Sequence, residues 1–323
     1  MSKEQALGNS HRLWGYPLMV LARLDWFLLL MIVLLMVGSV ITLKSSAGSE
    51  GIIARQLLRF VAGFCVFFVL LSIPARQLKR LTPLLYALTV VLLALVVVIG
   101  VDAGGARRWL NLGVVRLQPS EIAKLSVPLM VAWYLGRKEQ APSVWQVFMA
   151  LLIIALPFRL IMIEPDLGTS LLVGVSGLIA LFLAGLPLWL LLLGGVFISS
   201  AVPLFWWFGI KDYQRERVLT LFNPEADPWG AGYHIIQSKI AIGSGGVNGK
   251  GFMQGTQSQL EFLPESSTDF IFAVIAEEHG LTGVMILLAV YVMLVLRGLY
   301  LGARLTDRFS RIIVATIFFY VFF

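Results

Sequence analysis

The sequence predicts an all-α polytopic membrane protein, and three observations support this fold class. Hydrophobic residues make up 59% of the 323-residue chain and charged residues only 13%, whereas soluble domains carry about 25% charged residues. The mean hydropathy is +0.88. Apolar runs of about 18 or more residues, enough to cross a hydrocarbon core of roughly 30 Å, recur along the chain.

Charge and cysteine content exclude two other classes. The net charge is +7 and the pI about 9.7, but the basic residues stand in short clusters between apolar runs, as topogenic charges do. We therefore expect no nucleic-acid partner. Cys65 is the single cysteine and lies inside an apolar run, so a disulfide framework is excluded and we expect a core residue there.

The expected elements follow from these apolar runs. We expect one integral membrane domain over residues 1–323, with a cytoplasmic tail at 1–24 and a large extracytoplasmic loop with short helices at 209–268. Nine spans begin in this chain, at about 25–43, 52–73, 81–101, 121–136, 144–163, 166–184, 187–208, 281–297 and 312–323. Residues 269–278 are expected as a partial helix before the eighth span. The last run is too short to cross a bilayer, so we expect a truncated sequence.

The distribution of basic residues predicts the orientation. With the N-terminus inside, the clusters at 76–80, 137–138 and 297–311 all fall in the cytoplasm, as the positive-inside rule requires. Arg107, Arg108 and Arg116 then lie in a short outer loop at 102–120. Because the rule disfavours basic residues in an outer loop, these arginines indicate a specific function at that place.

Three acidic residues begin helices on this outer side: Glu121, Asp166 and Asp269. Each has a plain alternative as a cap or first-turn acid, with Ser120 and Asp166 as N-caps and Ser266 with Asp269 as a capping box. Carboxylates at the edge of the hydrocarbon nevertheless usually face a bundle interior or a water-filled cavity.

Lys124 lies one turn from Glu121 at the i, i+3 spacing. This spacing leaves two alternatives open, an internal salt bridge with Glu121 or a group that binds an anionic ligand.

The long loop contains two local patterns. Asp227 as a cap, followed by Pro228 at the first helical position, predicts the start of a short helix. The run Gly243–Gly251 fits neither a Walker A motif nor a dinucleotide fingerprint. We expect a flexible loop there, with a phosphate nest as the alternative. Glu277, Glu278 and His279 predict a polar helix break that packs against this loop rather than a zinc site.

Five motifs together resemble the SEDS family (shape, elongation, division and sporulation) and cover nearly the whole chain. They are Ala106–Gly113, Gln118–Lys124, Pro165–Ser170, Gly230–Gly246 and Phe262–Phe272. The segment Gly255–Phe262 is similar to the elongation branch of the family rather than to the division branch.

The resemblance implies a ten-span peptidoglycan glycosyltransferase of the bacterial inner membrane, with its active site facing the periplasm. Such enzymes polymerise lipid II, release undecaprenyl pyrophosphate, and work with a class B penicillin-binding transpeptidase and other membrane proteins of the elongation machinery. Asp269 matches the family's essential loop aspartate. The expected substrate-binding residues are Arg107, Arg108, Trp109, Glu121, Lys124, Asp166 and Lys239.

The chemistry of these residues fits that reaction. A carboxylate such as Asp269 can take the proton of the attacking sugar hydroxyl or hold a divalent cation, Mg²⁺ or Mn²⁺. The leaving pyrophosphate needs cations, for which the arginines and lysines are candidates.

The chain departs from the family pattern at three places. Glu164 stands where Gln is usual, Arg159 places a charge in the fifth span where it would snorkel or pair with Glu164, and the sequence stops before the family's last span.

Two other functions compete with the polymerase, a lipid II flippase or other transporter and a non-catalytic scaffold of the elongation complex. A transporter predicts ionisable groups along a path through the midplane, whereas here the polar groups gather on one side. That distribution favours an outward-facing enzyme.

Overall fold

The computed structural model describes most of the chain. The described residues are 24–47, 50–103, 106–111, 113, 116–137, 140–209, 212–230, 232–260, 262–263 and 266–322. The cytoplasmic tail expected at 1–24 therefore lies almost entirely outside the described residues, as does Lys138 of the second basic cluster.

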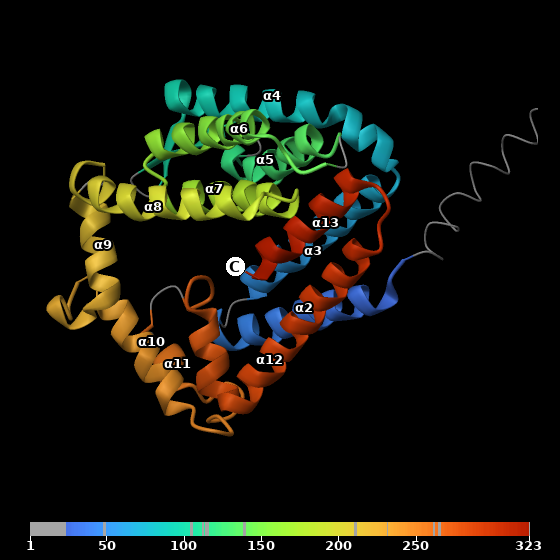
Figure 1. Ribbon diagram of the computed structural model, residues 1–323. Coiled ribbons are helices and arrows are strands. Elements are labelled where there is room, and N and C mark those ends of the chain that lie inside the picture. The colour runs from blue at the N-terminus through green and yellow to red at the C-terminus, as the bar shows by residue number, and fades with distance from the viewer. Residues whose placement is uncertain are drawn as a thin grey trace, which may run out of the picture. The chain divides into compact units, whose positions relative to one another are not determined.

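A helix forms at each expected span (Figure 1). These helices are α2 (Trp26–Ala47), α3 (Glu50–Leu71), α4 (Ala75–Ile99), α5 (Pro119–Leu135), α6 (Val144–Ile163), α7 (Leu167–Leu183), α8 (Leu188–Phe208), α12 (Ile271–Ala303) and α13 (Arg308–Phe322). Within the described ranges, α2, α3, α4, α6, α8 and α12 are long and apolar enough to cross a membrane. The fold class predicted from hydropathy is confirmed.

The loop regions hold the remaining elements. The loop after α4 forms a three-stranded antiparallel sheet of β1 (Val101–Ala103), β2 (Ala106–Asn111) and β3 (Arg116–Leu117), in the order β1-β2-β3. The large loop carries α9 (Asp212–Phe222), the 3₁₀ helix η1 (Pro224–Ala226), α10 (Tyr233–Ser244) and α11 (Thr256–Gln259). The short helices expected there are present, whereas the sheet was not expected from the sequence.

The chain divides into two compact units. One consists of Met1–Ile73 and Arg215–Leu294, and the other of Pro74–Gln214 and Val295–Phe323. The boundary within α12 means that this helix contributes its first part to one unit and its last turns to the other.

The second unit is built around α5. Four helices pack against α5, namely α4, α6, α7 and α13. Ten residues of α5 are buried. One apolar core joins these helices, with Leu93 of α4, Val127 and Val131 of α5, Val173 of α7 and Phe309 of α13 among its members. The N-terminal turn of α5, which carries Glu121 and Lys124, is thereby held by a well-packed helix.

The first unit has a smaller core beside the large loop. Ala241 of α10, Leu263, and Ala273 and Val274 of α12 form this cluster, with Phe270 packed against it. The cluster holds the beginning of α12 against α10, and Asp269 lies immediately before that beginning.

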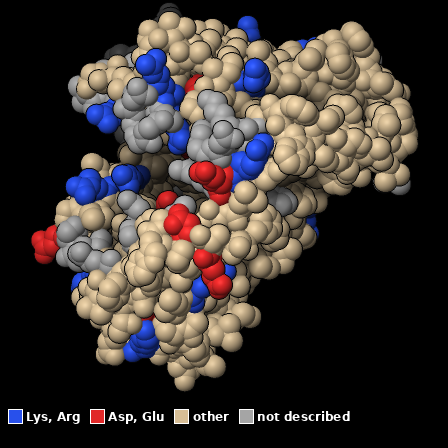
Figure 2. Space-filling model, turned by 90° about the vertical axis from the view of Figure 1, so that its left-hand side faces the viewer, with Lys and Arg blue, Asp and Glu red and all other residues tan. Residues whose placement is uncertain are grey.

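Large apolar side chains cover much of the surface, as a membrane-embedded chain requires. No residue of α3 is buried, and Val61, Val66 and Val69 are all exposed. On the face shown in Figure 2, uncharged residues make up most of the visible surface, with Lys, Arg, Asp and Glu side chains scattered among them. The prediction that Cys65 is a core residue is wrong, because this side chain is exposed on α3.

Candidate functional site

Glu121 and Lys124 form an ion pair on the first turns of α5. Lys124 Nζ lies 2.6 Å from Glu121 Oε2, at the expected i, i+3 spacing. Pro119 takes the first helical position after Gln118, where its missing N–H costs nothing. The N-cap predicted at Ser120 is therefore wrong by two positions. Of the two alternatives for Lys124, the structure contains the internal salt bridge.

Asp166 begins α7 and binds Arg108. Its Oδ1 accepts a hydrogen bond from the Thr169 backbone N–H at 3.2 Å, which confirms the predicted N-cap. Arg108 Nε lies 3.6 Å from Asp166 Oδ2, and its Nη2 donates to the Pro165 carbonyl at 3.5 Å. The Asp166 side chain is only 9% exposed, so water has little access to its carboxylate.

The register of the small sheet explains why Arg108, rather than its neighbour, makes this pair. Successive side chains of a strand point to opposite faces. Leu110, two residues after Arg108, is buried, whereas Arg107 is exposed. Trp109, half-buried, shares the alternate face with Arg107 and pairs across the sheet with Val101.

Glu164 lies buried beside this ion pair. It is only 3% exposed, and neither carboxylate oxygen has a hydrogen-bond partner among the described residues. Burial, and then the Asp166 carboxylate, raise the pKa of Glu164 to about 8, while the Arg108 guanidinium opposes the rise. The proposed pairing with Arg159 does not form in the described part of the chain, because Arg159 is exposed on α6 and no ion pair joins the two.

Asp269 occupies a different setting. It is exposed, in the turn of residues 266–270 that leads into α12. Since α12 begins at Ile271, the predicted capping box of Ser266 and Asp269 does not form. No hydrogen bond or ion pair engages the Asp269 carboxylate among the described residues. The adjacent Phe270 ring stacks on His234 of α10, with centroids 6.1 Å apart.

Lys239 is exposed on α10, and none of the ion pairs between described residues involves it. The helix that carries it begins at Tyr233, five residues after the predicted start at Pro228. Asp227 instead closes a turn, accepting from the Gly230 N–H at 3.0 Å. A Cβ at Gly232 would lie 2.0 Å from the Pro224 carbonyl oxygen, so this glycine permits a close backbone approach.

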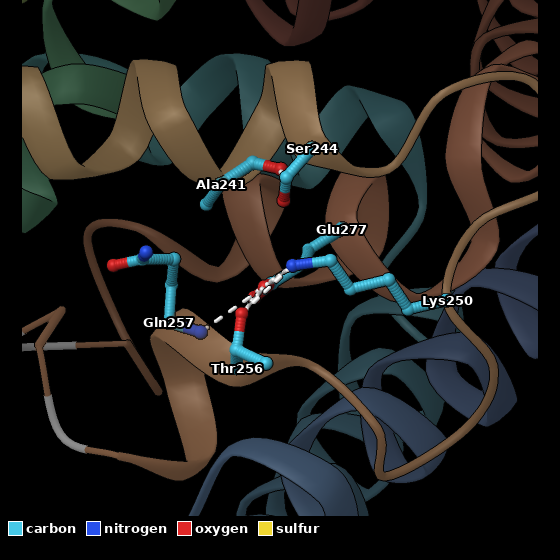
Figure 3. Close-up of polar contacts among 6 residues, drawn as sticks. All are labelled: Ala241, Ser244, Lys250, Thr256, Gln257 and Glu277. Atoms are coloured by element: carbon cyan, nitrogen blue, oxygen red, sulfur yellow. Dashed lines mark hydrogen bonds and ion pairs between the residues drawn. The ribbon is translucent and has the colours of Figure 1, made fainter.

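The sequence prediction missed the contacts of a buried carboxylate in the first unit. Glu277 of α12 is fully buried, and its Oε1 accepts from Lys250 Nζ at 2.6 Å, the Gln257 N–H at 3.0 Å and Thr256 Oγ1 at 3.1 Å (Figure 3). The pattern Glu277–Glu278–His279 pointed correctly to a helix break packed on the loop. The pattern did not predict that Lys250 pairs with Glu277.

The predicted site residues thus divide between the two units. Asp269 and Lys239 belong to the first unit, and the second contains Arg107, Arg108, Trp109, Glu121, Lys124 and Asp166. The structure joins Glu121 to Lys124 and Arg108 to Asp166. Asp269 and Lys239 carry charges that no ion pair engages within the described residues, and such groups are available to a ligand.

The available carboxylate and imidazole side chains decide whether the protein could hold a divalent cation. In the described ranges no three His, Cys, Asp or Glu side chains gather into a metal-binding group. Mg²⁺ is commonly held by one or two carboxylates together with substrate phosphates and water. Asp269 fits that mode because its carboxylate is exposed, with the remaining ligands coming from a phosphorylated substrate.

Comparison with known proteins places the chain among cell-wall enzymes. The family model described as "Cell cycle protein", for FtsW, RodA and SpoVE, matches residues 19–323. The chain is 48% identical over 304 residues to the peptidoglycan glycosyltransferase MrdB of Escherichia coli K12, covering 93% of this chain and 82% of that protein. It is 37% identical over 254 residues to the probable peptidoglycan glycosyltransferase FtsW of Idiomarina loihiensis, covering 77% of this chain and 61% of that protein.

Solved structures show the same fold. A chain from a peptidoglycan synthase complex, described as coordinating polymerization and crosslinking, superposes with a TM-score of 0.79 at 33% identity, covering 92% of this chain and 83% of that one. The rod shape determining protein RodA of Thermus thermophilus superposes with a TM-score of 0.67 at 27% identity, covering 92% and 81%. Taken with the match of the family model to residues 19–323, these relatives show that the chain is a multi-pass membrane protein that belongs to the SEDS family of FtsW, RodA and SpoVE.

Proposed function

We propose that this protein is a peptidoglycan glycosyltransferase that polymerises lipid II on the outer face of the bacterial inner membrane during cell elongation. The observation that carries the proposal is an exposed carboxylate, Asp269, without an ion-pair partner among the described residues, in a chain 48% identical to MrdB across 93% of its length. A lipid-linked substrate also suits a polar site placed at the ends of apolar helices.

In this reaction the 4-hydroxyl of one lipid II sugar attacks the anomeric carbon of a second lipid II. The bond from that carbon to the pyrophosphate oxygen breaks, and undecaprenyl pyrophosphate leaves with the bonding electron pair. Asp269 accepts the hydroxyl proton as general base. A divalent cation, where one is bound, would be held by Asp269 and would neutralise pyrophosphate charge.

The cationic residues take two kinds of role in this proposal. Lys239 is exposed in the same unit as Asp269 and contacts the pyrophosphate, whose charge grows as the bond breaks. Arg108 and Lys124 are paired with Asp166 and Glu121, so their role is to hold the shape of the substrate-binding residues of the second unit. Trp109, half-buried on β2, offers an aromatic face to the sugar.

We also propose a class B penicillin-binding transpeptidase as the partner. Support comes from the structural relative in a peptidoglycan synthase complex that coordinates polymerization and crosslinking. A polymerase held beside a transpeptidase would pass each new strand directly to crosslinking.

One experiment separates the polymerase from a transporter. The purified chain, together with its transpeptidase, is given lipid II in detergent and, in parallel, in proteoliposomes. The proposal predicts long glycan strands and released undecaprenyl pyrophosphate in both settings. Movement of lipid II across the proteoliposome bilayer without strand formation would overturn it in favour of a flippase.

A further inference from the structure

Helix α12 is broken at Gly280, and the break is bridged by a glycine-rich turn of the large loop. Gly280 has φ 60° and ψ −161°, a region open essentially to glycine alone. The carbonyls of Glu277 and Glu278, which the break leaves without helical partners, accept from the N–H groups of Lys250 at 3.0 Å and Gly251 at 2.9 Å.

The same turn also satisfies the donors beyond the break. The N–H groups of Leu281 and Thr282 donate to the carbonyls of Gly246 and Val247 at 2.9 and 3.1 Å. Four backbone hydrogen bonds therefore join residues 246–251 to the break. This close approach explains the glycines, because a Cβ at Gly249 would lie 2.1 Å from the Glu278 carbonyl oxygen. The glycine-rich run is thus a packed turn, and the expectation of a flexible loop there is wrong.

The side chain of Glu277 adds a second connection to the same loop. Its Oε1 receives Lys250 Nζ, Thr256 Oγ1 and the Gln257 N–H, and Lys250 Nζ also donates to Thr256 Oγ1 at 2.8 Å (Figure 3). A fully buried carboxylate is costly unless it is paired and hydrogen-bonded. The three donors meet that requirement and fix the start of α11 against α12.

From α11 the connection continues to the segment before Asp269. The Gln257 carbonyl accepts from the Leu263 N–H at 3.2 Å, and Leu263 is buried in the cluster with Ala241 and Val274. Asp269 follows in the turn that ends at Phe270, whose ring packs against that same cluster. The stretch from α11 to α12 is therefore held at both ends, by Glu277 at one and by the apolar cluster at the other.

We propose that Glu277 is a positioning residue: with Lys250, it anchors the loop that carries Asp269 to the outer part of α12 and so holds the Asp269 carboxylate in its working place. The proposal rests on the proposed function, and it gives the Glu277–Lys250 ion pair a role in the rate of polymerisation. Glu277 itself touches no substrate. It acts through the loop.

The test compares two neighbouring buried glutamates. Glu277→Gln keeps the shape of the side chain but removes the charge that binds Lys250. Glu278→Gln is the matched control, because Glu278 is equally buried but its side chain accepts from Ser45 of α2 instead of from the loop. The full chain with its transpeptidase is assayed for the kcat and KM of lipid II polymerisation, for thermal unfolding and for backbone hydrogen exchange.

We expect Glu277→Gln to lower kcat by about 10- to 100-fold, the scale of a roughly 1 Å misplacement of a catalytic group. KM for lipid II and the unfolding temperature stay near the wild-type values, and exchange increases within residues 255–270. Lys250→Met reproduces the fall in kcat and the faster exchange but also lowers the unfolding temperature, because the buried Glu277 carboxylate loses its cation. The conservative Lys250→Arg retains most of kcat. Glu278→Gln leaves kcat and exchange in that segment unchanged.

Three results would overturn the proposal: wild-type kcat in Glu277→Gln, unchanged exchange in residues 255–270, or a fall in kcat that follows only a fall in unfolding temperature. If the proposed function itself is wrong, the wild-type chain and Glu278→Gln make no strands either. That result is different from a loss of activity in Glu277→Gln alone. The exchange measurement needs no catalysis and tests the anchoring in that case too.

Discussion

At the scale of single residues, the two units carry carboxylates in opposite environments. Asp269 is exposed and, within the described residues, has no ion-pair partner, whereas Glu164 is buried without any hydrogen-bond partner there and next to a second acid. Environment decides the charge of such groups. Glu164 is therefore suited to stay neutral beside the Arg108–Asp166 pair.

Glu164 gives a prediction for stability against pH. Its pKa is about 8 in the folded protein and 4.5 as the ordinary value, so the folded state binds more protons than the unfolded state between these values. The stability from neutral Glu164 is fully present below the ordinary value and is lost as pH rises through about 8. Glu164→Gln, which mimics the neutral acid, should flatten this loss.

The measurement is the unfolding temperature of the two proteins in detergent between about pH 6 and pH 9. Wild type should lose more stability than Glu164→Gln across this range, and the variant should be the more stable protein at the alkaline end. Parallel pH profiles for the two proteins would show that Glu164 is not held neutral.

At the scale of elements, hydropathy predicted the helices well because the length of an apolar run is a strong local signal. It predicted α6 at Val144–Ile163 to the residue and anticipated a break before Leu281. The three-stranded sheet was missed, because strands of three, six and two residues give no such signal. The start of α10 was missed because the close approach of Gly232 to Pro224 outweighs the cap signal at Asp227.

The bridged break in α12 gives a prediction at this scale. Gly280→Ala should destabilise the protein by about 3 kcal/mol or more, because alanine strains at the Gly280 backbone angles and its Cβ would meet Gly249 N at 2.3 Å. Thermal unfolding should show a fall of more than roughly 5 °C. Gly38→Ala is the control, because a Cβ at Gly38 of α2 meets nothing within 4 Å. Equal unfolding temperatures for the two variants would contradict the bridging of the break.

At the scale of the whole molecule, the sequence alone predicted the family but only part of the site. Five motifs indicated the SEDS family, and the match over residues 19–323 confirms it. The Glu121–Lys124 pair was among the predicted alternatives because both residues lie on one helix turn. The Arg108–Asp166 and Lys250–Glu277 pairs were not predicted, because only the fold brings together residues 58 and 27 positions apart.

The orientation in the membrane and the roles of the site residues remain predictions of charge distribution and resemblance. The positive-inside rule predicts the outer side of the membrane for Asp269, as it does for Arg107 and Asp166. We propose that the Asp269 carboxylate takes the proton from the attacking hydroxyl.

The most direct test is the rate of glycan strand formation from lipid II by Asp269→Asn in complex with the transpeptidase. Asparagine keeps the size of the side chain but cannot accept the proton, so the rate should fall by about 10²- to 10⁴-fold, the usual contribution of a general base. The unfolding temperature and lipid II binding should stay at wild-type values. Strand formation by Asp269→Asn at the wild-type rate would show that the Asp269 carboxylate does not take the proton.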